Sequence, residues 1–231
     1  MKPFPILLFL LIGMRLVGNA QNNGFEILKR MHDKYAKGPC KCYTFSQKNT
    51  HYRNDSIVGT SEWHESIEFP DRFKIVFGDA KQGNYMEFRN DSSYRFKKGV
   101  FQKAQRDSNS LLLILGGMYY RDLNEVNARL KKAGFNADIL SQQTWGQYKA
   151  YVIGADPNDL KSNQIWVDKN SLKVLRILEK MANGNIMDMR FESHQTWCNG
   201  FVETKVSFRR NGKLEQVEEY YDLKECKTNT H

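Results

Sequence analysis

The side chains best suited to chemistry in this sequence are its four cysteines, Cys40, Cys42, Cys198 and Cys226. In an oxidising compartment an even number permits disulfides, and four cysteines allow three complete pairings. Cys40 and Cys42 are poor partners, because alternate residues of a strand point the same way with their backbones too far apart. A C-x-C pair is also half of a metal site, but no second cysteine or histidine pair follows at ligand spacing. We expect structural cysteines and no metal, with free buried thiols as the alternative.

Catalytic motifs are absent from the sequence. It contains no G-x-S-x-G, S-x-x-K or H-E-x-x-H pattern and no phosphate-binding glycine loop. His64 beside Glu65 could pair a base with an orienting acid, but neighbours on a strand face opposite sides. Asp168 could serve as an acid or a metal ligand, but aspartate is also favoured in turns such as the one that follows it. We therefore expect a protein that is not an enzyme and has no cofactor.

The N-terminus has the three parts of a secretory signal. Lys2 is the positive region, residues 4–12 form a short apolar core, and Gly18 and Ala20 are small residues before a cut at Gln21. The alternative is an uncleaved anchor helix, but the apolar run is shorter than the roughly 20 residues that span a bilayer. We expect residues 1–20 to be a signal peptide, which makes the mature chain periplasmic or secreted.

The formal net charge of +9 is spread along the 231 residues in both signs. No dense basic helix, zinc finger or RNA-binding signature accompanies this charge. A solvated basic surface is the simpler interpretation, so we expect no nucleic-acid partner and at most peripheral contact with a membrane.

Helical spacing occurs in three places. Apolar residues recur at this spacing from Phe25 to Tyr35, and Gly38-Pro39 ends the pattern. Residues 110–115 are apolar on nearly all sides, and residues 123–133 are amphipathic, with Gly134 as a C-cap. We expect one leading helix and two central ones.

The rest of the chain alternates with a period of two, interrupted by turn residues such as Asn199-Gly200 and Asn211-Gly212. The strand candidates are residues 41–48, 57–69, 73–77, 85–89, 93–97, 137–144, 147–153, 164–167, 172–179, 186–194, 201–210 and 213–223. About eleven strands predict a mainly β (α+β) domain over 21–226, with a polar tail at 227–231. An antiparallel sheet of this size tends to curl toward a barrel or half-barrel.

The C-terminal hairpin suggests one cysteine pair. Pairing about Asn211-Gly212 places residues near Gly200 opposite residues 221–223, and Cys198 and Cys226 lie just past that end. We therefore predict a Cys198–Cys226 disulfide.

Several segments resemble the superfamily of periplasmic outer-membrane-lipoprotein carriers and their relatives (LolA/LolB-like). These are the leading helix from Phe25 to Tyr35, the step Pro70-Asp71-Arg72-Phe73-Lys74, the central helical insertion and the hairpin from Ile165 to Arg176. The resemblance covers most of the mature chain in element order. It implies an unclosed β half-barrel whose helices form a plug or lid over an apolar cavity.

The resemblance implies that the cavity holds a lipid or the acyl chains of a lipoprotein in the cell envelope. The residues expected to line it are Phe73, Ile75, Phe77 and Phe88 from the sheet, and Leu111, Leu112, Leu115 and Met118 from the lid, with Gly116-Gly117 as its hinge. The alternative for these residues is ordinary core packing. The chain would then be an envelope sensor or structural domain that binds a protein partner.

Overall fold

The computed structural model describes residues 23–36 and 40–226. The chain starts with α1 (Gly24–Tyr35) and a first run of strands: β1 (Cys42–Arg53), β2 (Ser56–Glu68), β3 (Arg72–Phe77), β4 (Tyr85–Arg89), β5 (Ser92–Lys97) and β6 (Val100–Arg106), with the 3-10 turn η1 (Ala80–Gln82) before β4. The predicted signal peptide, residues 1–20, the Gly38-Pro39 pair and the tail at 227–231 lie outside the described residues.

Three short helices separate this run from a second one. They are α2 (Ser110–Leu115), η2 (Gly117–Tyr120) and α3 (Leu123–Lys132). The second run comprises β7 (Leu140–Trp145), β8 (Tyr148–Ile153), β9 (Gln164–Asp168), β10 (Val174–Lys180), β11 (Ile186–Glu192), β12 (Gln195–Trp197), β13 (Gly200–Val202), β14 (Lys205–Arg210) and β15 (Lys213–Glu225). No helix among the described residues is long and apolar enough to cross a membrane.

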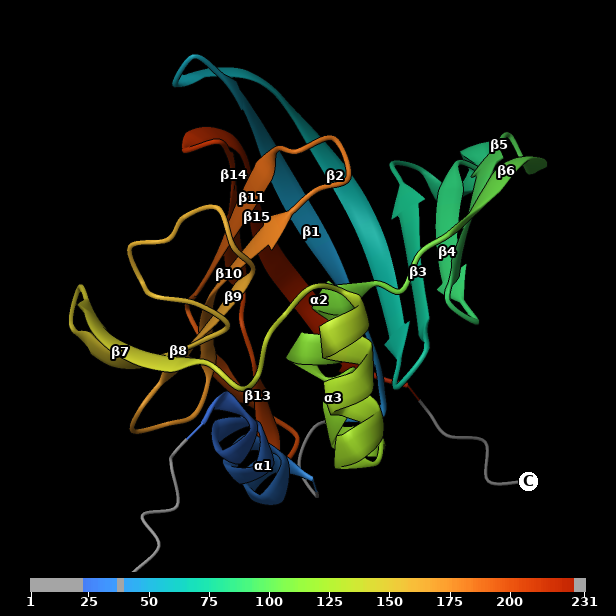
Figure 1. The fold of residues 1–231 in the computed structure, drawn as a ribbon. Helices are drawn as coiled ribbons and strands as arrows, with labels where there is room; N and C mark the ends of the chain where they lie inside the picture. Colours follow the sequence, from blue (N-terminus) through green and yellow to red (C-terminus); the bar gives the residue numbers. More distant parts are fainter. Residues whose placement is uncertain (1–22, 37–39, 227–231) are drawn as a thin grey trace, which may run out of the picture.

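Thirteen strands form one curved antiparallel sheet in the order β6-β5-β4-β3-β2-β1-β15-β14-β11-β10-β9-β8-β7. The edge strands β6 and β7 do not pair, so the sheet is unclosed. Figure 1 shows the helices gathered on one side of the sheet, between the β3–β6 wing and the β7–β10 wing. This architecture confirms the predicted fold class.

The helices begin where the sequence supplies caps. At α1 the Asn23 side chain accepts a hydrogen bond from the Glu26 amide at 3.1 Å, and at α3 the Asp122 side chain accepts two. The buried face of α1 packs into the main core with α3 and η2. The main core therefore lies between the helices and the second run of strands. No residue of the β3–β6 wing belongs to it.

The strand predictions were wrong in three places: β6 and β12 were not predicted, and the predicted strand 201–210 is not continuous. β6 was not predicted, since all seven of its residues are exposed and it lacks an apolar face. The predicted strand 201–210 is interrupted at Glu203 and Thr204, where β13 leaves the large sheet to pair with β12.

The predicted Cys198–Cys226 disulfide is also wrong. Cys40 bonds to Cys198 and Cys42 bonds to Cys226, with Cα–Cα separations of 5.6 and 5.3 Å. All four cysteines are bonded, which also excludes the alternative of free thiols in this structure.

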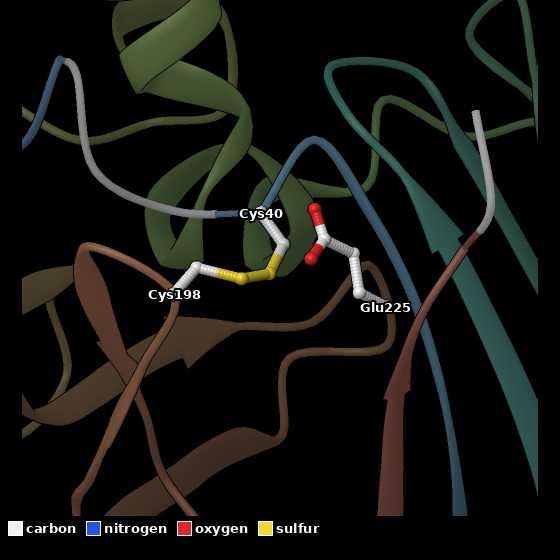
Figure 2. A group of neighbouring side chains, drawn as sticks. All are labelled: Cys40, Cys198 and Glu225. Atoms are coloured by element: carbon white, nitrogen blue, oxygen red, sulfur yellow. A yellow bond between two sulfur atoms is a disulfide. The ribbon is translucent and has the colours of Figure 1, made fainter.

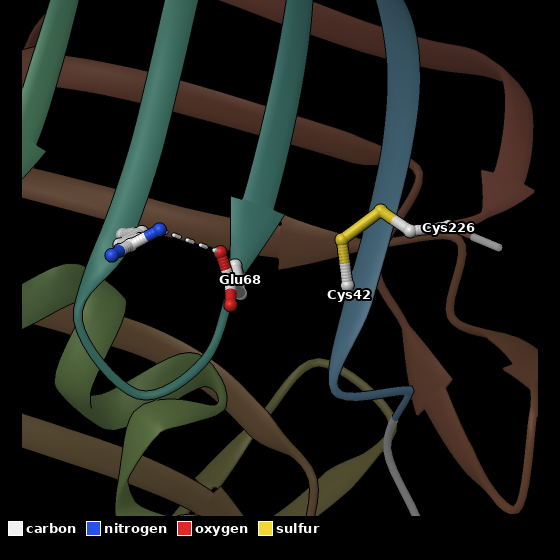
Figure 3. Close-up of a disulfide and its surroundings, with 4 residues drawn as sticks. Cys42, Glu68 and Cys226 are labelled. Atoms are coloured by element: carbon white, nitrogen blue, oxygen red, sulfur yellow. Dashed lines mark hydrogen bonds and ion pairs between the residues drawn. A yellow bond between two sulfur atoms is a disulfide. The ribbon is translucent and has the colours of Figure 1, made fainter. Parts of the chain in front are cut away.

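The physical reason is that the C-terminal hairpin is not straight. Because the chain leaves the large sheet before β14, Cys198 lies in the separate β12–β13 hairpin and not beside the end of β15. β15 itself continues past β14 and stays paired with β1. There the Cys226 amide donates to the Cys42 carbonyl at 3.1 Å. Figure 3 shows the resulting bridge at the start of β1, next to Glu68 at the end of β2.

Candidate ligand-binding groove

The concave face of the first wing is built by strand alternation. Ile75 pairs with Glu65 and Met86, and Phe73 pairs with Ile67 and Phe88. Residues opposite each other on antiparallel strands share a face, so these side chains point toward the helices. The Phe73 and Phe88 rings stack with centroids 5.6 Å apart.

An open groove of about 350 Å³ lies where this wing meets the second run of strands and the segment that leads into α2. Its polar residues include Glu179 and Asn109. Most of its apolar lining comes from β3, β4, α2 and β11, with one residue after β10 and one in β14. The apolar residues are Phe73, Ile75, Phe88, Leu111, Met181, Met187, Met189 and Phe208. The thioether side chains adapt to irregular shapes, which suits a flexible apolar ligand.

The eight predicted lining residues fall into three groups. Phe73, Ile75, Phe88 and Leu111 line the groove. Leu112 and Leu115 line a second, smaller cavity beneath α2. Phe77 packs edge-on against Trp63, and Met118, 1% exposed, belongs to the main core; neither lines either space.

The start of α2 is fixed across the groove. Asn109 caps α2 by accepting a hydrogen bond from the Leu112 amide at 2.9 Å. Ser110 Oγ donates to Glu179 Oε1 of β10 at 2.8 Å. The pKa of the Glu179 carboxyl is raised, because the effect of burial exceeds the opposing effect of the Ser110 hydrogen bond. The hydrogen bond from Ser110 thus connects the start of α2 to the far side of the groove.

The second cavity, of about 60 Å³, is partly acidic. Glu65 and Glu203 line it together with Tyr43 and Tyr220, and each carboxyl-bearing residue is only 7% exposed. Burial raises the pKa of Glu65 well above its ordinary value, and the charge of Glu218 adds to this effect. Burial likewise raises the pKa of Glu203 to about 7.

Glu218 belongs to the same interior but has partners. Tyr220 Oη donates to it at 2.8 Å and Gln216 Nε2 donates at 2.7 Å. The pKa of Glu218 is raised to about 7, because the effect of burial exceeds the opposing effect of these hydrogen bonds. Sequence reasoning did not identify the three glutamates as inward-facing. For Glu65 a signal was present, because it lies in phase with Trp63 and Ile67 along the predicted strand 57–69.

Two arginines, one just before α3 and one within it, connect the helices to the sheet. Arg121 forms ion pairs with Asp71 in the β2–β3 turn and with Glu125. Arg129 Nη1 lies 2.7 Å from Asp91 Oδ1 in the β4–β5 turn, and its Nε lies 2.9 Å from Glu125 Oε1. These ion pairs connect the lid to two hairpin ends of the first wing.

Of the residues considered for catalysis and metal binding, Glu65 lines the second cavity, whereas His64 and Asp168 line neither the groove nor that cavity. His64 is half-exposed beside Ser46, 2.9 Å from its Oγ, whereas Glu65 is buried on the other face. Asp168 Oδ2 accepts a hydrogen bond from the Ser171 amide at 2.8 Å, as turn chemistry predicts.

One group among the described residues has the spacing of metal ligands: Cys40, Cys198 and Glu225, whose candidate ligand atoms lie within 4.8 Å of one another. Figure 2 shows that the two sulfur atoms of this group are joined in a disulfide, with the carboxylate beside them. Bonded sulfurs supply no thiolate, and a thiolate is the form of cysteine that binds metals. The group is structural in this oxidised form.

Comparisons with known proteins support the fold assignment. No protein-family model and no curated protein matches the sequence. Three crystal structures match in fold, each with 12% sequence identity: a DUF1329 family protein from Desulfovibrio piger (TM-score 0.59, covering 90% of this chain and 93% of that one), a LolA superfamily protein from Nitrosomonas europaea (0.59, 89% and 94%), and a proposed outer membrane lipoprotein-sorting protein domain from Vibrio parahaemolyticus (0.58, 90% and 94%). These matches confirm the fold that the resemblance implied: this chain shares its fold with the three proteins, one of which is a LolA superfamily protein.

Proposed function

We propose that this chain is an exported, non-enzymatic binding protein of the cell envelope that holds a lipid or the acyl chains of a lipoprotein. The observation that carries the proposal is the open 350 Å³ groove with its apolar lining from both wings of the sheet. Each methylene that a ligand buries there contributes about 0.8 kcal/mol. An acyl chain is therefore a ligand that this surface can bind without specific polar contacts.

Three further features agree with this proposal. The fold matches that of a proposed lipoprotein-sorting domain. Two disulfides suit an oxidising compartment such as the periplasm. The N-terminal residues have the pattern of an export signal.

Native mass spectrometry of the mature protein, purified from its own envelope, tests the proposal. We expect a co-purified lipid or acylated peptide, and uptake of a fluorescent fatty acid by protein from which it has been removed. Ile75→Asp places a carboxylate in the groove and is expected to abolish uptake, because the charge would have to be desolvated beside the chain.

Val76→Asp is the matched control. Val76 neighbours Ile75 on β3 but lies on the other face of the sheet, outside the groove. Both variants are compared by circular dichroism and thermal unfolding before uptake is measured. A clean apo mass with no uptake by the wild type would reject the proposal and favour a packed domain that binds a protein partner.

A further inference from the structure

The groove and the acidic cavity adjoin each other. Phe73, Asn109 and Leu111 line both, so the two spaces meet at the start of α2. A ligand whose chain lies in the groove can therefore place one end in the cavity beneath the helix. The chemistry of that cavity then determines which end group is bound.

The cavity contains acceptors that lack partners. No side chain among the described residues donates a hydrogen bond to the Glu65 or the Glu203 carboxyl. The Glu203 carboxyl accepts one from its own backbone amide and lies close enough to Glu218 to be affected by its charge. Nearby, Gln47 is fully buried and its Oε1 has no hydrogen-bond partner in the described part of the chain. Buried polar groups are normally paired, so these acceptors indicate a missing donor.

No described lysine or arginine supplies that donor. The residues that line the cavity are apolar, aromatic or acidic, apart from Asn109. An ionised carboxylate in such a place is destabilised unless an opposite charge accompanies it. An anionic end group would be repelled, whereas a primary ammonium brings one positive charge and three donors.

We propose that the acidic cavity binds the primary ammonium group of an amphiphile whose apolar chain occupies the adjoining groove. This inference rests on the proposed function, because it needs the groove to hold the chain. Glu65 and Glu203 accept from the ammonium, and Glu218 adds to the negative potential from behind. The structure thus assigns a ligand class that is narrower than lipid in general.

The test compares three probes of equal chain length, decylamine, decanol and decanoate, each below its micelle concentration. Calorimetry with the mature protein at about pH 8, above the pKa of about 7 of Glu203 and Glu218, gives their affinities. We expect decylamine to bind at least about tenfold more tightly than decanol, and decanoate to bind most weakly. Glu65→Gln is expected to remove most of the preference for decylamine over decanol.

Glu219→Gln is the control, since Glu219 is exposed next to Glu218 on β15 and has no ion pair among the described residues. It should keep the wild-type preference. Equal affinities for decylamine and decanol would overturn the inference, with the cavity then holding water, but would leave the proposed function intact. No binding of any probe would overturn the proposed function as well.

Two sources could supply such an ammonium, and further probes separate them. Lysophosphatidylethanolamine is compared with its N-acetylated form, and a decanoylated lysine peptide with its N-acetyl-lysine form. A preference for the free amine in either pair supports the inference and identifies the source as a lipid or an acylated protein. Loss of preference in both pairs overturns it.

Discussion

Glu203 lies where the chain leaves the sheet between β13 and β14, and it is 7% exposed. Burial, with a contribution from the charge of Glu218, raises its pKa from 4.5 to about 7. The folded state therefore holds this proton more tightly than the unfolded chain does. The resulting stability is fully present below about pH 4.5 and is lost as the pH rises through about 7.

Glu203→Gln removes this titration while keeping the shape of the side chain. We expect the variant to have a higher free energy of unfolding than the wild type at about pH 8, by up to about 3 kcal/mol, since one pH unit corresponds to about 1.4 kcal/mol. At about pH 4 the two proteins should be equally stable. Urea unfolding at both pH values measures the difference, and an equal effect at both would show that packing, not ionisation, is responsible.

The sequence predicted the apolar half of the site better than the acidic half. Alternation along β3 placed Phe73 and Ile75 on one face, and the structure brings Phe88 to the same face. Glu65 was considered only as an acid beside His64, and that pair was set aside because neighbours on a strand face opposite sides. Its phase with the apolar residues of the same strand was not used. Its burial depends on β1, which pairs with its own strand, and on α2, which lies far from it in the sequence.

At the scale of elements, α3 connects the lid to the first wing. Arg129→Ala removes the ion pairs with Asp91 and Glu125, and Arg129 is only partly exposed. We expect a loss of about 1 kcal/mol of stability and about fivefold faster hydrogen exchange in α2 and α3. Exchange measured by mass spectrometry, at low and high salt, provides the test.

Lys132→Ala is the control for this variant. Lys132 is exposed on the same helix and forms no ion pair with the described residues. Its exchange should match the wild type. Added salt should narrow the gap between wild type and Arg129→Ala, because screening weakens the ion pairs. Unchanged exchange in Arg129→Ala would mean that apolar packing alone keeps the lid in place.

Elements with strong local signals were predicted well. The helices at 24–35, 110–115 and 123–132 have caps and apolar spacing, and most hairpins have turn residues. The break at Glu203 and Thr204 has no such signal. It results from tertiary contacts, since Thr204 Oγ1 donates to the Ser193 carbonyl at 2.8 Å while the Thr204 carbonyl accepts from the Tyr220 amide at 2.8 Å.

At the scale of the whole molecule, the sheet consists of two runs of strands joined at one seam. β15 is last in sequence yet lies between β1 and β14, so the β1–β15 pairing connects the runs. Cys42–Cys226 closes one end of this seam, and Cys40–Cys198 attaches the β12–β13 hairpin beside it. A pairing argument limited to one hairpin could not find these bridges, because each spans most of the chain.

A tryptic digest can distinguish the two disulfides, because Lys41 lies between Cys40 and Cys42. Trypsin cleaves after it, between Cys40 and Cys42, so a digest without reduction should contain a Cys40–Cys198 peptide pair and a distinct Cys42–Cys226 pair. A peptide pair joining Cys198 to Cys226 would contradict the structure.

The bridges should also differ in what they stabilise. They close loops with sequence separations of 158 and 184, so replacing either pair with serines should cost up to about 5 kcal/mol of unfolding free energy in the chain-entropy model. Removing Cys42–Cys226 should speed hydrogen exchange along the β1–β15 seam, whereas removing Cys40–Cys198 should speed it in residues 195–202. Each serine pair serves as the control for the other. Identical exchange maps would show that neither bridge acts locally and that both stabilise the fold only by restricting the unfolded chain.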